Sequence, residues 1–123
     1  MAISTLAAYY YPGWHPCAVR DAGFPRGFSE WDLVFNASPR FEGHLQPTKP
    51  LWGRQDESDP SVFSQKIDTA RHYGIDLFVF AYYWSRGKRL LEGALDRGLI
   101  GCAAENPFPF ALMWANRMPR RVL

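Results

Sequence analysis

The chain has 123 residues, a hydrophobic fraction of 47% and a net charge of +2. This length allows one domain at most, and that hydrophobic fraction excludes a disordered chain. The small charge argues against a nucleic-acid partner, and no apolar run reaches the roughly 20 residues of a membrane-spanning helix. The unusual figure is the aromatic content of 16%, made up of 9 Phe, 6 Tyr and 5 Trp.

The first predicted element is a strand over residues 6–11, because an apolar and aromatic run ends there at Pro12-Gly13. A long loop is expected at about residues 12–58, which are rich in Pro, Gly and aromatic residues and show no sustained periodicity. A loop of that length inside a compact domain usually carries function or its own local packing.

Regular spacing returns after Asp59, where apolar residues recur at helical intervals and predict a helix over residues 61–73. Asp59 can accept from the free N–H groups of the first turn, and Pro60 suits the first helical position. Gly74 then ends the helix, since glycine is the residue most often found just beyond a helix C-terminus.

A nearly continuous apolar run over residues 75–84 predicts a strand that is buried on both faces, as in a parallel sheet. Residues 85–88 are expected to form a turn, residues 90–104 a second helix and residues 110–115 a third strand. Three glycines each weaken the second helix by about 1 kcal/mol relative to Ala. They are Gly93, Gly98 and Gly101.

The predicted order of elements is βαβαβ, which implies parallel strands joined by right-handed crossovers. No Gly-rich phosphate loop follows the first strand, so a dinucleotide-binding half is disfavoured. The remaining common parallel architecture is the (β/α)8 barrel, which needs about 250 residues. We therefore predict an α/β fold, an incomplete TIM-type barrel with its first three parallel strands and the intervening helices. Residues 1–123 would form the N-terminal part of that single domain.

Each predicted strand ends in aromatic residues that are followed by polar ones. In a barrel these carboxyl ends converge on the active-site face. Rings with polar tips offer an apolar plane and a hydrogen-bonding edge, and sugars need both. The pattern predicts a carbohydrate-binding rim, and the alternative is that these rings fill the core or the barrel mouth. The residues concerned are Tyr10, Tyr11, Trp14 and His15, then Tyr82, Tyr83, Trp84, Ser85 and Lys88, and finally Trp114, Asn116 and Arg117.

The acidic residues offer no obvious catalytic pair, although most glycosidases need two carboxylates. Glu30 is the best candidate, because its neighbours Phe28 and Trp31 are aromatic. Glu57 and the acids beside it fit the entry of the helix better, in a solvated or capping role.

Cysteine and histidine residues predict no metal site and no cofactor. Cys17 and Cys102 lie far apart and lack metal spacing, so we expect free thiols. His15 and His44 are the loop histidines, and neither has a partner at a spacing typical of metal ligands. The N-terminus shows no recognisable secretory signal, so a cytoplasmic location is expected.

Several motifs follow one another in order along the chain. They are Tyr10-Tyr11-Pro12, Gly27-Phe28-Ser29-Glu30-Trp31, Gly43-His44-x-Gln46-Pro47, Tyr82-Tyr83-Trp84, Gly87-Lys88-Arg89-Leu90-Leu91 and Trp114-Ala115-Asn116. Together they resemble the WbsX-like family, also described as glycoside hydrolase family 99-like, over about residues 7–116.

The resemblance implies a (β/α)8 barrel that acts on complex polysaccharide of the lipopolysaccharide or O-antigen type. In that family a late Asn-Glu-Trp segment is the better catalytic candidate, and it is absent here. Arg117 stands where many members have Glu. The main acid and nucleophile are therefore expected beyond Leu123, which leaves Glu30 as the catalytic candidate within this sequence. The residues expected to line the glycan are Tyr10, Tyr11, His15, Glu30, Trp31, His44, Gln46, Tyr83, Trp84, Lys88, Trp114 and Asn116.

Three functions remain open at this point. The first is a glycoside hydrolase-like enzyme present as a fragment, whose partners are an oligo- or polysaccharide and the missing C-terminal part of the same barrel. The second is a non-catalytic carbohydrate-binding remnant. The third is a glycosyltransferase of polysaccharide biosynthesis, which would need a nucleotide-sugar site that nothing in the sequence resembles.

Overall fold

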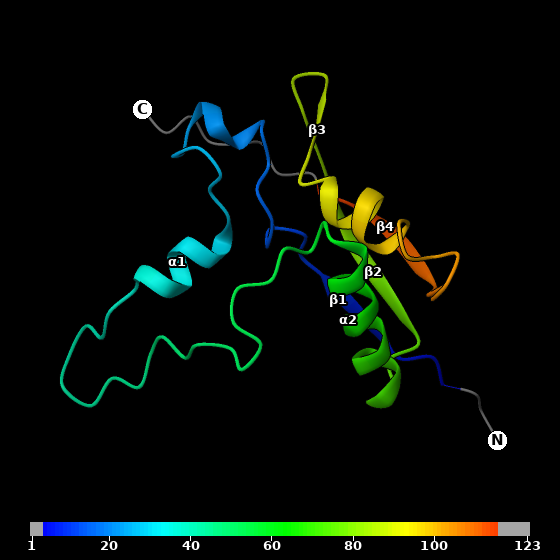
Figure 1. Ribbon diagram of the computed structural model, residues 1–123, viewed down its shortest axis with the longest axis horizontal. Helices are drawn as coiled ribbons and strands as arrows, with labels where there is room; N and C mark the ends of the chain where they lie inside the picture. Colours follow the sequence, from blue (N-terminus) through cyan, green and yellow to red (C-terminus); the bar gives the residue numbers. More distant parts are fainter. Residues whose placement is uncertain (1–3, 116–123) are drawn as a thin grey trace.

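The computed structural model describes residues 4–115, which form one four-stranded sheet with helices on one of its faces (Figure 1). Strand β2 (Leu77–Ser85) is the central strand. It pairs in parallel with β1 (Ala7–Tyr10) on one side and with β4 (Phe110–Trp114) on the other. The three parallel strands predicted from the sequence are confirmed, in the spatial order β1-β2-β4. The fold is therefore mixed α/β with a partly parallel sheet.

The helix predicted between the first two strands is α2 (Pro60–His72), and its ends follow the expected chemistry. The Asp59 carboxylate accepts from the Ser61 backbone N–H at 2.8 Å. At the other end Gly74 takes a positive φ of 79°, a left-handed conformation that glycine reaches without strain.

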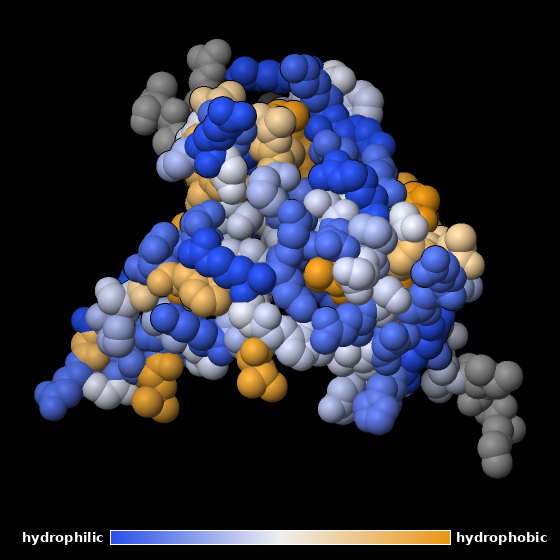
Figure 2. Space-filling model, in the orientation of Figure 1, coloured by the Kyte–Doolittle hydropathy of each residue, from blue (hydrophilic) through white to orange (hydrophobic). Residues whose placement is uncertain are grey.

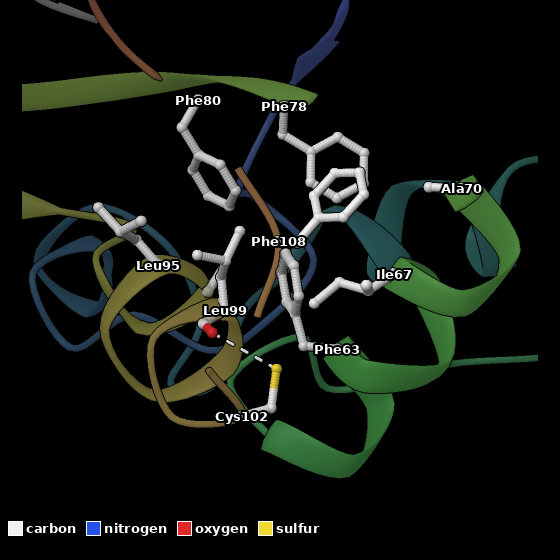
Figure 3. Packing of buried hydrophobic residues seen from close by; sticks show 10 residues of the cluster. Phe63, Ile67, Ala70, Phe78, Phe80, Leu95, Leu99, Cys102 and Phe108 are labelled. Carbon is white, nitrogen blue, oxygen red and sulfur yellow. Dashed lines mark hydrogen bonds between the residues drawn. The ribbon is translucent and has the colours of Figure 1, made fainter. Parts of the chain in front are cut away.

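The core lies between this helix and the sheet (Figure 3). Phe78 and Phe80 point from β2 toward Phe63 of α2 and toward Leu95 and Leu99, which belong to a second helix. Phe63, Phe80 and Leu99 are almost completely buried. Burying such apolar side chains supplies the main stabilisation of a small fold.

The β4 edge of the sheet and the face turned away from α2 are not covered by other described residues. Every residue of β4 is exposed, with Leu112 and Trp114 more than half accessible. Tyr9 on β1 is 80% exposed on the face away from α2. One face and one edge of the sheet therefore carry large apolar side chains that nothing in the described chain covers.

The long loop contains regular structure that the sequence analysis missed. Helix α1 spans Glu30–Asn36, and a short 3-10 turn, η1, spans Arg20–Ala22. A capping box begins α1, in which the Asp32 side chain accepts from the Ser29 backbone N–H at 2.9 Å. With seven residues the helix is too short to show a clear period, so its cap was its best sequence signal.

The predicted helix over residues 90–104 is wrong in its first part. Residues Lys88–Leu90 form β3, which pairs antiparallel with the end of β2 and makes a hairpin. The helix that follows, η2 (Ala94–Leu99), is a π-helix, in which the Ile100 backbone N–H donates to the Leu95 carbonyl at 2.8 Å. Lys88, expected in a turn, therefore lies on a strand.

Two of the glycines that weaken this helix are explained by close approach. A Cβ at Gly98 would lie 2.2 Å from the Glu57 carbonyl oxygen, and one at Gly93 would lie 2.7 Å from the His15 ring. Glu57, in the segment before α2, and His15, in the turn after β1, can approach this helix so closely only because Gly98 and Gly93 have no side chain. The glycines lower helix propensity and in exchange permit tight packing.

We expect Gly98→Ala to lower the free energy of unfolding by about 1–3 kcal/mol, the usual effect of overpacking a core. The added methyl meets the Glu57 backbone carbonyl oxygen and the ring of the fully buried Phe63. Urea unfolding followed by circular dichroism measures the change. Gly23→Ala is the matched control, because a Cβ there meets no atom within 4 Å. Equal midpoints for Gly98→Ala and wild type would contradict the packing described.

Candidate functional site

The alternation of side chains along the strands divides the predicted aromatic rim between two faces. Phe78 and Phe80 face the helices, so Tyr82 and Trp84 lie on that face and Tyr83 lies on the other. Tyr10 likewise belongs to the helix side, where its ring stacks on Phe80 with centroids 4.6 Å apart. The predicted residues are therefore not one continuous surface.

On the open face, four side chains meet at the carboxyl ends of β1 and β2. The Tyr11 hydroxyl and an Arg20 N–H both donate to Oε1 of Glu30, each at 2.9 Å. The Tyr11 ring meets the Tyr83 ring edge-on, with centroids 6.1 Å apart. We call Tyr11, Arg20, Glu30 and Tyr83 the strand-end cluster.

The local sequence explains how the strand-end cluster forms. Gly13 lets the chain turn tightly against it, since a Cβ there would lie 2.3 Å from the Tyr11 ring. The Arg20 guanidinium lies over the Phe28 ring at 4.6 Å, which holds it beside Glu30. Its Nη1 atom is buried and has no hydrogen-bond partner among the described residues. Arg20 was missed from the sequence, where no spacing links it to Glu30.

The electrostatics of the strand-end cluster fix the protonation of Tyr11. Burial, and then the hydrogen bond to the Glu30 carboxylate, raise the pKa of Tyr11 to about 12. The phenol therefore stays protonated at neutral pH and acts as a donor. The Glu30 carboxylate accepts both hydrogen bonds through Oε1, and among the described residues no hydrogen bond to its Oε2 is found.

A second polar group, behind the sheet, was not recognised from the sequence. Glu57 is 1% exposed, and its Oε1 accepts from the Tyr10 hydroxyl at 2.5 Å and from the Lys66 ammonium. Burial raises the pKa of Glu57, against the lowering effect of Lys66, and also raises the pKa of Tyr10. Glu57 thus joins β1 to α2 and is more than part of the helix entry. Tyr10 serves that junction instead of facing a ligand.

His15 is buried as well, at 1% exposed, against Gly93. Burial lowers the pKa of His15, and the charges of Arg97 and Arg20 act in the same direction while Asp56 opposes them. Its Nδ1 has no partner among the described residues. The neutral imidazole belongs to the bend that follows β1.

Three predicted residues of the long loop make contacts within their own segment. The Trp31 indole N–H donates to the Gln55 carbonyl at 2.6 Å. His44 stacks on Phe41 at 4.5 Å, and Gln46 bonds with Thr48. The chain between α1 and α2 extends away from the sheet (Figure 1), so His44 and Gln46 are not brought to the strand-end cluster.

The remaining predicted residues are exposed near the ends of the strands. Trp84 on β2 pairs with Arg89 of β3, and Lys88 pairs with Ser85. Trp114 is 60% exposed and lies beside Tyr82, with ring centroids 5.9 Å apart. Asn116 lies outside the described residues.

Within residues 4–115 no group of three or more His, Cys, Asp or Glu side chains is placed to hold a metal ion. None of the helices found there is both long enough and apolar enough to cross a membrane. Cys17 and Cys102 are buried free thiols, as expected.

Burial of neutral His15 makes stability depend on pH. Its folded pKa is lowered, so the unfolded chain binds the proton more readily, and stability should fall as pH drops from about 7.5 to about 5.5. His15→Gln should flatten that slope, as measured by urea midpoints at several pH values. His72→Gln, at an exposed site on α2, is the control and should keep the wild-type slope. An unchanged slope in His15→Gln would contradict the assignment.

The amino-acid sequence was compared with known proteins over its whole length. No solved structure matches it. A protein named "Uncharacterized protein WxcX" from Xanthomonas campestris pv. campestris, found in strains B100 and ATCC 33913, is 39% identical over 114 residues. The match covers 92% of this chain but 16% of that protein, so the chain spans about a sixth of the length of these relatives.

A family model described as "Glycosyltransferase WbsX" matches residues 6–122. That match includes the strand-end cluster, both helices that cover the sheet and all four strands. A family with this description has a glycan-related role, in agreement with the carbohydrate chemistry expected from the aromatic strand ends. The chain belongs to the WbsX family.

Proposed function

We propose that this chain forms the N-terminal part of a glycan-active domain, and that the glycan lies over the carboxyl ends of β1 and β2. The strand-end cluster is the observation that carries this proposal. It combines two tyrosine rings, a carboxylate and a guanidinium, and within residues 4–115 no hydrogen-bond partner is found for Glu30 Oε2 or for the buried Nη1 of Arg20. Rings for stacking and both signs of hydrogen-bonding group are what a sugar requires.

The open sheet supports a larger architecture around this site. Three adjacent parallel strands carry helices on one face, while the other face and the β4 edge remain apolar and exposed. We propose that these strands are the first three of a (β/α)8 barrel, in which the open face becomes the interior. Tyr11 and Tyr83 would then face the mouth of that barrel.

For the reaction, we propose cleavage of glycosidic bonds in complex polysaccharide, with the principal acid and nucleophile in the remainder of the longer protein. The motifs resembling glycoside hydrolase family 99-like proteins favour hydrolysis. The family description favours a second candidate, glycosyl transfer. In either case Glu30 and Arg20 would bind and orient the sugar. The hydrogen bonds from Arg20 and Tyr11 fix the position of the Glu30 carboxylate before any sugar binds.

Polysaccharide binding tests the proposal. O-polysaccharide released from lipopolysaccharide should bind the 123-residue chain in isothermal titration. Tyr83→Ala should weaken binding roughly tenfold, the effect of losing about 1.4 kcal/mol of contact energy. Tyr83→Phe keeps the ring and should retain most of the affinity.

Two control variants show which face binds. Tyr73→Ala removes an aromatic ring that is 74% exposed at the far end of α2, and should leave the affinity unchanged. Trp114→Ala removes a ring on the helix side of the sheet. Loss of binding in Trp114→Ala with full binding in Tyr83→Ala would place the glycan on the wrong face for this proposal.

The isolated chain should not turn over its glycan, because it contains no second carboxylate beside Glu30 in the strand-end cluster. Release of reducing sugar from the same O-polysaccharide measures this. Substantial hydrolysis by residues 1–123 would show that the chemistry resides in this segment. Binding of UDP or GDP by the longer protein would instead favour the transferase.

A further inference from the structure

A small pocket lies between α1, α2 and the loop that joins them, apart from the strand-end cluster. Its volume is about 340 Å³, at the lower end of the range of roughly 300–1,000 Å³ found for ligand pockets. Two indole rings and two polar side chains contribute to its wall. The lining residues are Trp31, Pro50, Leu51, Trp52, Gly53, Gln55 and Lys66.

The aromatic wall is held by contacts independent of any ligand. The Trp31 ring packs against Trp14 with centroids 4.4 Å apart, and its N–H is tied to the Gln55 carbonyl. Trp52 is carried on a tight turn closed by the Gly53 N–H, which donates to the Pro50 carbonyl at 3.0 Å. Gly53 adopts φ +67°, so glycine is favoured there.

The loop that carries Trp52 is fastened to α1 at the same point. The Arg54 guanidinium donates to the Asp32 carboxylate at 3.0 Å and lies over the Phe35 ring at 4.7 Å. The exposed indole of Trp52, 43% accessible, therefore stands on a fixed loop. A preorganised wall of this kind lowers the entropy lost on binding.

The polar side of the pocket is set by α2. Gln55 donates through Nε2 to the side-chain Oε1 of Gln65 at 3.1 Å, which fixes the Gln55 amide. The Lys66 ammonium bonds to the buried Glu57 carboxylate, and its side chain is 20% exposed. An ammonium has three N–H donors, so this bond leaves two of them. The charge of Lys66 is already compensated, which favours an uncharged hydroxyl over an anion.

We propose that this pocket binds one neutral sugar residue of a glycan, stacked on Trp52 and bonded through its hydroxyls to Lys66 and Gln55. The apolar ring wall beside donors and an amide matches a sugar, which has C–H faces and hydroxyl edges. Only the class of ligand rests on the proposed function, since the pocket itself is defined by its own residues. The pocket would extend glycan recognition beyond the strand ends.

Fluorine NMR of the chain labelled with 5-fluorotryptophan tests this inference. The five Trp signals are assigned by single Trp→Phe substitutions, and the probes are the methyl glycosides of glucose, mannose, galactose and rhamnose. At least one glycoside should shift the Trp31 and Trp52 signals saturably. Trp52→Ala should weaken that binding at least tenfold, whereas Tyr73→Ala, which removes an exposed ring at the far end of α2, should leave it unchanged. Circular dichroism verifies that each variant is folded.

Each other result overturns the inference in a distinguishable way. No saturable shift with any glycoside removes the pocket as a sugar site. Equal shifts with cyclohexanol show an unspecific apolar hollow, and tighter binding of methyl glucuronide contradicts a neutral ligand. Binding that survives Trp52→Ala but disappears in Tyr83→Ala assigns the sugar to the strand-end cluster, so the pocket fails while the proposed function stands. Binding lost in Trp52→Ala and kept in Tyr83→Ala supports the pocket by itself.

Discussion

The fold depends on one residue, Glu57, which connects three of its elements. Its carboxylate accepts from Tyr10 at the end of β1 and from Lys66 of α2, while its backbone carbonyl lies against Gly98 of η2. A buried carboxylate is expensive to remove from water unless it is paired and hydrogen-bonded, and removing one partner of such a pair is strongly destabilising. The long loop is therefore anchored where it returns to the sheet.

This anchor also decides which side chains face the open side of the sheet. With Tyr10 held on the helix side, the next residue, Tyr11, is turned to the open face, where it meets Glu30 and Tyr83. Polar atoms gather near the carboxyl ends of the strands, and they include Nη1 of Arg20 and Nδ1 of His15, for which the described part of the chain offers no hydrogen-bond partner. The hydrophobic surface of Figure 2 is broken into small areas on the face it shows, with a few large apolar side chains projecting from the loop.

Much of this architecture could be predicted from the sequence, because the parallel strands and α2 carry strong local signals. The apolar run over residues 75–84 and the Asp59-Pro60 cap each identify their element without knowledge of the rest. The errors fall where distant packing decides the backbone. Lys88–Leu90 pairs with β2, although the sequence predicts a turn up to Lys88 and a helix from Leu90. The following helix, η2, widens to a π-helix where Gly98 meets Glu57. The contact between Arg20 and Glu30 could not be predicted, because the loop between them shows no periodicity from which its path could be inferred.

The contact between Gly98 and the Glu57 carbonyl has an evolutionary consequence. The Glu57 carbonyl is part of the backbone, so no change of side-chain rotamer can move it away from a larger residue at position 98. Position 98 can accept another residue only if η2 shifts as a body, and that shift would also disturb His15 where it packs on Gly93. Substitutions at positions 15, 57, 93 and 98 are thus coupled, and a lineage is expected to change them together or leave all four alone.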